Sequence, residues 1–133
     1  MPVQYRSCTI LAFFLLAVIP SVHAVERSEV PEKHRWDLEA LYPDEASWVA
    51  ARQEFAKAIP SVAAHQGKLG DSAAALLAGM TAYEQALRQG ERLYAYAFQR
   101  YSEDTRVGRT MQMQQEMTQA YSDFQSAVAF MRP

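Results

Sequence analysis

The sequence is short of the residues from which thiol sites are built. Cys8 is the single cysteine among the 133 residues, and it lies ahead of the longest apolar run. If the chain is cut after Ala24, as argued below, the remaining residues contain no thiol. That absence excludes disulfides, thiolate catalysis and cysteine-based metal sites from the mature chain.

Histidine and surplus positive charge are also scarce. The histidines are His23, His34 and His65, and no other residue with ligand spacing joins them. We therefore interpret His34 and His65 as solvated or capping residues and not as a metal pair. Residues 25–133 carry 12 Lys and Arg against 15 Asp and Glu, a formal charge of −3. This mildly acidic balance argues against nucleic acid as a partner.

The first 24 residues have the three-part pattern of a secretory signal peptide. Arg6 gives a positive start, and the apolar run from Thr9 to Ile19 follows. Pro20 ends the run, and small residues precede a cleavage site after Ala24. The pattern predicts export to the periplasm or secretion. A run of 11 residues is too short to cross a bilayer, so we expect no stable membrane anchor after cleavage. Retention as an uncleaved anchor is the alternative.

Residues 25–43 are predicted to form an extended segment with Trp36 and Leu41 as apolar anchors. Asp44 is a good N-cap for a helix that we expect to run from Glu45 to about His65. Pro60 should kink or restart this helix, because it has no backbone N–H to donate. The apolar residues expected on one face of this helix are Trp48, Ala51, Phe55, Ile59 and Val62.

Two further helices are predicted after Gly67–Gly70. The first is capped at Asp71-Ser72 and runs to Tyr101, with a possible break near Gly90. Its apolar residues, spaced alternately by four and three, form a continuous seam: Leu76, Met80, Tyr83, Leu87, Gly90, Tyr94, Ala97 and Tyr101. The next helix follows a corner capped by Asp104, and its seam consists of Met113, Met117, Ala120, Phe124, Ala127 and Met131, widened by Tyr121 and Val128.

These patterns predict an all-α fold of long antiparallel helices, namely a hairpin plus one kinked helix. We expect a helical domain over residues 44–133 that is incomplete at its C-terminus. The apolar face still runs at Met131, and broad apolar faces suggest that covering residues are missing.

Residues 31–44, PEKHRWDLEALYPD, followed by Trp48, resemble the opening of oligoendopeptidase F and its relatives in the M3 group of zinc metallopeptidases. That opening reads Pro-x-x-x-x-Trp-Asp-Leu-x-x-Leu-Tyr and precedes an acidic helix start. Further similar pieces follow in order at residues 67–70, 93–97 and 103–105. The resemblance covers about residues 30–133, and it implies the N-terminal part of a larger helical peptidase fold.

The resemblance implies that the full-length protein is a zinc metalloendopeptidase that cuts short peptides inside a deep channel. Its zinc site would be a His-Glu-x-x-His helix, in which two histidines share one face and the glutamate activates the zinc-bound water. His23, His34 and His65 are followed by Ala24, Arg35 and Gln66, so this motif does not occur here. We therefore assign no catalytic, cofactor-binding or metal residue to this chain.

The function expected from the resemblance is a non-catalytic wall or rim of the substrate channel, inactive alone. The partners would be the missing C-terminal catalytic domain and, through the full-length protein, zinc and peptide substrates. The alternative is a stand-alone exported helical domain that binds a partner without enzymatic activity. Two further groups of residues have simpler interpretations. The tyrosines are interpreted as packing residues, and the interleaved arginines and acids as a solvated face with i, i+4 pairs.

Overall fold

A computed structural model describes residues 26–131. Three long helices follow one another along the chain: α1 (Glu45–Ala63), α2 (Ala73–Glu103) and α3 (Gly108–Ala127). Short 3-10 helices flank them: η1 (Arg27–Glu29), η2 (Glu32–His34) and η3 (Ala129–Met131). No strand occurs between residues 26 and 131, and the predicted all-α fold class is confirmed. The signal peptide predicted for residues 1–24 lies outside the described residues.

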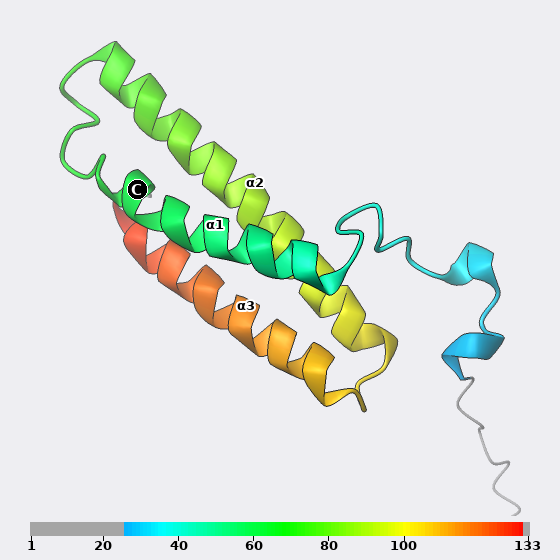
Figure 1. Cartoon of the computed structure of the whole chain (residues 1–133). Helices are drawn as coiled ribbons and strands as arrows, with labels where there is room; N and C mark the ends of the chain where they lie inside the picture. The colour runs from blue at the N-terminus through cyan, green and yellow to red at the C-terminus, as the bar shows by residue number, and fades with distance from the viewer. Residues whose placement is uncertain (1–25, 132–133) are drawn as a thin grey trace, which may run out of the picture.

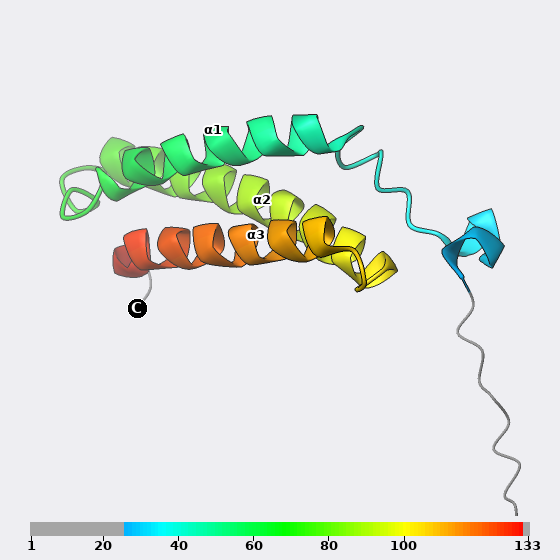
Figure 2. The same ribbon diagram turned by 60° about the horizontal axis from the view of Figure 1, so that its bottom comes forward.

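The three helices pack lengthwise as a small bundle. Figure 1 shows α1 and α3 running against the direction of α2, and Figure 2 shows α1 and α3 on either side of it. Each helix contacts the other two. The predicted hairpin of the second and third helices is therefore confirmed, and α1 packs against both of its helices.

The start of α1 follows the sequence prediction. Asp44 caps the helix, because its Oδ1 accepts a hydrogen bond from the backbone N–H of Ser47 at 2.7 Å. Hydrogen bonds from Ser47 lower the pKa of Asp44. Pro60 lies in the last turn, and the helix continues through it to Ala63 without restarting.

Two predicted details of the hairpin are wrong. α2 is a continuous helix of 31 residues that starts at the predicted cap, Ser72, and does not break at Gly90. Gly90 is buried, so helix packing there outweighs the weak helix propensity of glycine. Asp104 does not cap α3, whose N-cap is Val107 with no side-chain hydrogen bond. Its carboxylate instead accepts hydrogen bonds from the backbone and side chain of Arg106.

Aromatic side chains connect the helices in the core. Phe55 of α1 contacts Phe124 of α3 with ring centroids 5.5 Å apart. Trp48 is fully buried, and its indole Nε1–H donates to the carbonyl of Leu93 at 3.0 Å. The predicted face of α1 is confirmed. The largest fully buried side chains are Trp48, Phe55, Phe124, Leu93, Met113, Met117, Val62 and Val128.

The segment before α1 is anchored by Leu38 and Tyr42 in addition to the predicted Leu41, but not by the predicted Trp36. Trp36 is 51% exposed, whereas Leu38 and Tyr42 are buried. A turn brings the last two to the same side, because the N–H of Tyr42 donates to the carbonyl of Leu38 at 3.0 Å. Arg92 of α2 holds this turn, since its Nε donates to the carbonyl of Leu41 at 3.2 Å. Its guanidinium also lies 5.2 Å from the ring centre of Tyr42. The segment predicted to be extended therefore contains this turn and the 3-10 helices η1 and η2.

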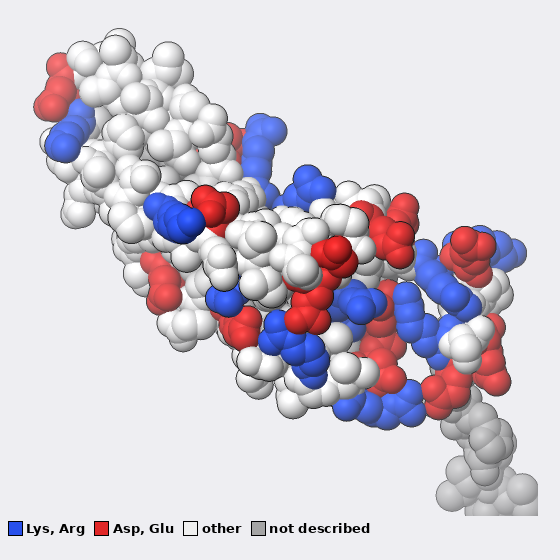
Figure 3. Space-filling model, in the orientation of Figure 1, with Lys and Arg blue, Asp and Glu red and all other residues white. Residues whose placement is uncertain are grey.

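Charged side chains attach the N-terminal segment to the turn between α2 and α3. Arg106 bonds the Asp104 carboxylate at 2.8 Å and that of Glu26 at 3.0 Å. Arg27 pairs with Glu103, whose side chain is almost fully buried. Figure 3 shows Lys, Arg, Asp and Glu side chains gathered at this end. The predicted i, i+4 pairing holds for Glu84 with Arg88, but these longer-range pairs were not predicted.

Replacement of Gly90 by alanine should destabilise the bundle. A Cβ at this position would lie 3.0 Å from two ring atoms of Phe55. Overpacking of this kind costs roughly 1–3 kcal/mol, against a gain of about 1 kcal/mol in helix propensity. We expect the free energy of unfolding, measured in urea, to fall by about 1 kcal/mol.

Gly108→Ala is the matched control for this substitution. Nothing lies within 4 Å of the Cβ that it would add at the start of α3. This variant should be at least as stable as the parent chain. Equal gains in stability for both variants would contradict the close contact between Phe55 and Gly90.

Acidification should release the N-terminal segment before it unfolds the bundle. Hydrogen bonds from Arg106 lower the pKa of Asp104 to about 2 and lower the pKa of Glu26. Because the pKa values of both carboxyl groups are lowered in the folded chain, both groups are charged and paired with Arg106 at any pH above the ordinary carboxyl pKa. This pairing should be lost as the pH falls from about 4 towards about 2. Backbone NMR signals of η1 and α1 can follow the two regions separately.

The double substitution Arg106→Gln/Arg27→Gln, which removes both ion pairs to the N-terminal segment, should release the same segment at neutral pH and leave the bundle folded. If the η1 signals of this variant stayed at their native positions, the ion pairs would not be what holds the segment.

Candidate interaction surface on helix α2

Helix α2 has two apolar faces of different composition. The face towards α1 and α3 is dominated by small residues, and its buried members are Gly79, Ala86, Gly90, Leu93, Tyr96 and Ala97. A neighbouring side of the helix carries larger side chains at spacings of about three, four or seven. We call it the outer stripe, and its exposed members are Leu76, Leu77, Met80, Tyr94 and Phe98; the half-buried Leu87, which also packs against the core, lies between Met80 and Tyr94.

The predicted seam of α2 combined these two faces. Gly90 and Ala97 of that seam are buried, but Leu76 and Met80 are 47% and 48% exposed. Steps of four and three fit either face of a helix that is apolar on both sides, so spacing alone does not separate them. The seam of α3 was placed correctly, with Met113, Met117 and Phe124 all buried.

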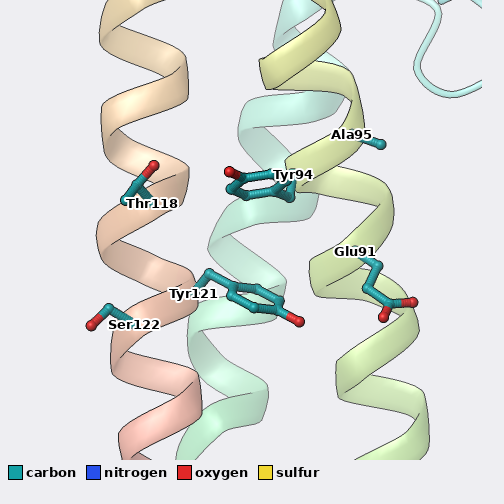
Figure 4. Close-up of a pocket in the computed structure, with 6 residues that line it drawn as sticks. All are labelled: Glu91, Tyr94, Ala95, Thr118, Tyr121 and Ser122. Atoms are coloured by element: carbon teal, nitrogen blue, oxygen red, sulfur yellow. The ribbon is translucent and has the colours of Figure 1, made fainter.

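A groove of about 460 Å³ lies between α2 and α3 beside the outer stripe. Figure 4 shows its residues on these two helices, with the rings of Tyr94 and Tyr121 between them and α1 behind. The ring centres of Tyr94 and Tyr121 are 5.9 Å apart. Tyr94 also stacks on Phe98 at 6.0 Å. The lining residues are Glu91, Tyr94, Ala95, Thr118, Tyr121 and Ser122.

The groove offers contact surface and not a catalytic arrangement. Its walls are mainly apolar, with the Glu91 carboxylate and a few hydroxyls at its edges. The Thr118 hydroxyl donates to the backbone carbonyl of Gln114 at 2.9 Å. No histidine is among the lining residues to serve as a base for Ser122 or Thr118. Such a surface suits apolar or aromatic side chains of a partner.

The tyrosines serve as packing residues to different extents. Tyr96 is buried against Trp48, with ring centres 6.5 Å apart. Burial raises the pKa of the Tyr96 hydroxyl. Tyr83 stacks on Phe124 at the edge of the core, and Tyr121 lies tilted against the same ring. Tyr94 extends this aromatic row outwards to the groove.

The two histidines within residues 26–131, His34 and His65, are not brought together. His34 is exposed in η2, ahead of α1, whereas His65 follows the far end of α1 and packs against Gly79. Within residues 26–131 no group of three or more His, Cys, Asp or Glu side chains is placed to hold a metal ion. The described residues therefore do not fit the zinc site that the sequence resemblance implies for a full-length protein.

In the part of the chain that the structure covers, no helix combines the length and apolar character needed to span a membrane.

Sequence comparison relates this all-helical chain to bacterial oligopeptidases. Oligopeptidase PepF of Bacillus subtilis (strain 168) is 31% identical over 108 residues, which are 81% of this chain and 16% of PepF. Oligoendopeptidase F (plasmid) of Lactococcus lactis subsp. cremoris is 32% identical over 111 residues, 83% of this chain and 18% of that protein. Group B oligopeptidase PepB of Streptococcus agalactiae is 29% identical over 107 residues, 80% of this chain and 18% of PepB.

These relatives indicate the oligoendopeptidase F family, and the resemblance of the opening motif to that family is confirmed. The chain spans only 16–18% of the length of these curated relatives. No family model matches the chain. No solved structure matches it either.

The purified chain should retain far less than one zinc ion per molecule after dialysis. The physical reason is that His34 and His65 lie apart and lack further ligands, whereas a stable zinc site has four ligands, or three with an open position. Metal content is measured by elemental analysis. Stoichiometric zinc that disappeared in a His34→Ala/His65→Ala variant would contradict this prediction.

Proposed function

We propose that this chain is the N-terminal, non-catalytic portion of an exported zinc metallo-oligopeptidase that hydrolyses short peptides. Its helices form a wall or rim of the substrate channel, and the zinc ligands lie in another part of the protein. The single observation that carries the proposal is the match of about four fifths of this chain to less than one fifth of known oligopeptidases. The resemblance of the opening motif to the start of family members supports the N-terminal position.

The geometry is suited to a wall. α2 is a continuous helix of 31 residues, which at 1.5 Å per residue is roughly 46 Å long. Buried aromatic contacts fix α1 and α3 against it, including Phe55 with Phe124 at 5.5 Å. A packed helix of this length gives a stiff edge along which a channel can be built. Export rests on the signal-peptide pattern of residues 1–24, and the absence of His-Glu-x-x-His from the sequence makes the chain inactive alone.

The second candidate function is a stand-alone exported helical domain that binds a partner. The observation that favours it is the exposed apolar surface of α2, where Leu77 is 68% exposed. The two functions differ in one measurable respect. A peptidase portion must restore activity to a relative that lacks the matching region, whereas an unrelated binding domain has no reason to do so.

A chimera of the B. subtilis PepF tests the proposal. Its region matched by this chain is replaced by residues 26–133, and hydrolysis of a short fluorogenic peptide is measured. The truncated PepF without any replacement should lose about 100-fold or more in activity, because displacement of a channel wall by about 1 Å is enough for such a loss. The chimera should recover most of this activity, and the 133-residue chain alone should show none.

Two outcomes would count against the proposal. If the truncated PepF were as active as the intact enzyme, the region would not be part of the functional channel. If the chimera were no more active than the truncated enzyme, the stand-alone binding domain would be the better explanation.

A further inference from the structure

The exposed large apolar side chains of α2 lie in the outer stripe, whereas its inner side combines small residues with the buried Leu93 and Tyr96. Leu76, Met80 and Phe98 are between 45% and 48% exposed, whereas Ala86 and Ala97 are nearly fully buried. From Leu76 to Phe98 the outer stripe extends over roughly 33 Å of helix. Single exposed apolar residues are common on proteins, but a continuous stripe of this kind marks an interaction surface.

We propose that the outer stripe is the docking surface for the remaining polypeptide of the peptidase, which packs lengthwise on α2. This inference rests on the proposed function. It adds which surface of the bundle makes the contact and which side chains are covered. α1 and α3 already occupy the inner side of α2, and α3 also contacts Tyr94 at the edge of the outer stripe, so the exposed remainder of the stripe is left to receive another element.

The relatives supply the argument for this occupant. The matched region is 16–18% of their length, so more than four fifths of such a protein is available to cover the stripe. The spacing of the stripe along a continuous helix fits a partner element that lies parallel or antiparallel to α2.

The distribution of charge favours an apolar contact over an electrostatic one. Charged side chains are dense around the N-terminal segment and the turn between α2 and α3, where Arg106 and Arg27 are paired within the chain. Figure 3 shows few charges at the opposite end, around the start of α2. From residue 72 to residue 83 the sequence has no Lys, Arg, Asp or Glu. Leu76, Leu77 and Met80 lie in this uncharged part. A charged partner surface would find no side chain of opposite charge there with which to form an ion pair.

The groove beside Tyr94 belongs to the same surface. Tyr94 and Phe98 stack on one another, and Tyr121 lies beside them on α3. We assign this groove to an apolar side chain of the docked polypeptide. Its volume of about 460 Å³ is sufficient for a large side chain.

Photo-crosslinking in the PepF chimera tests the surface directly. Benzoylphenylalanine is placed at Met80 in one variant and at Gln53, an exposed position on α1, in the control. After irradiation and digestion, mass spectrometry identifies the attached peptides. We expect the probe at Met80 to join peptides of the PepF remainder, and the probe at Gln53 to join few or none.

Charge substitutions provide a second, independent readout. Met80→Glu/Phe98→Glu in the chimera should reduce peptide hydrolysis by about tenfold or more, because two carboxylates would be buried in an apolar contact. The matched control, Gln53→Glu/Ala56→Glu, adds the same charge to the exposed side of α1 and should leave activity within about twofold. In the 133-residue chain alone, the stripe variant should melt at nearly the parent temperature, since both side chains are already exposed.

The outcomes separate this inference from the proposed function. An active parent chimera whose stripe variant stays fully active, or whose Met80 probe labels no remainder peptide, would overturn the docking surface and leave the peptidase assignment intact. Crosslinks that join two chimera molecules would show a second copy as the occupant and would also overturn it. A parent chimera without activity would instead count against the proposed function.

Discussion

The contact between Phe55 and the bare backbone at Gly90 is the constraint on which the bundle depends. A Cβ on Gly90 would lie 3.0 Å from the Phe55 ring, so α1 reaches this position only because α2 has no side chain there. The Phe55 ring then extends to Phe124 of α3, with ring centres 5.5 Å apart. One aromatic side chain thus fixes all three helices. The small residues Ala86 and Ala97 continue the same close approach along α2.

This close packing has a consequence for the other side of α2. Four of the six buried residues of α2 are glycine or alanine, and only Leu93 and Tyr96 are large, so most of its larger apolar residues lie elsewhere. In α2 they form the outer stripe, and Leu77 with 68% exposure is its most accessible member. The bundle is therefore well packed on one side and apolar but uncovered on the other. An edge element of a larger helical protein has this division, since each of its faces contacts a different neighbour.

Local patterns predicted the helices well but not the contacts between distant residues. The cap at Ser72 and the buried face of α1 follow from side-chain chemistry and helix periodicity within one element. The division of α2 into two faces does not follow from the local sequence, because apolar residues occur at helical spacing on both faces. The groove depends on the register that brings Tyr94 next to Tyr121, and the attachment of Glu26 to Arg106 joins residues 80 positions apart. Neither pairing leaves a signal in the local sequence.

The structure also gives a physical account of the motif that relates this chain to oligoendopeptidase F. Within it, Leu38 and Tyr42 are the buried residues, and the exposed Trp36 is not an anchor in this bundle. Tyr42 lies edge-on to Tyr96 with ring centres 5.4 Å apart, and Arg92 holds the carbonyl of Leu41. The motif thus attaches the segment before α1 to the middle of α2, immediately before Asp44 starts the first helix. Trp36 lies next to this attachment and is half-exposed. Because its large apolar ring stays in contact with water unless a partner covers it, this position offers a further contact surface.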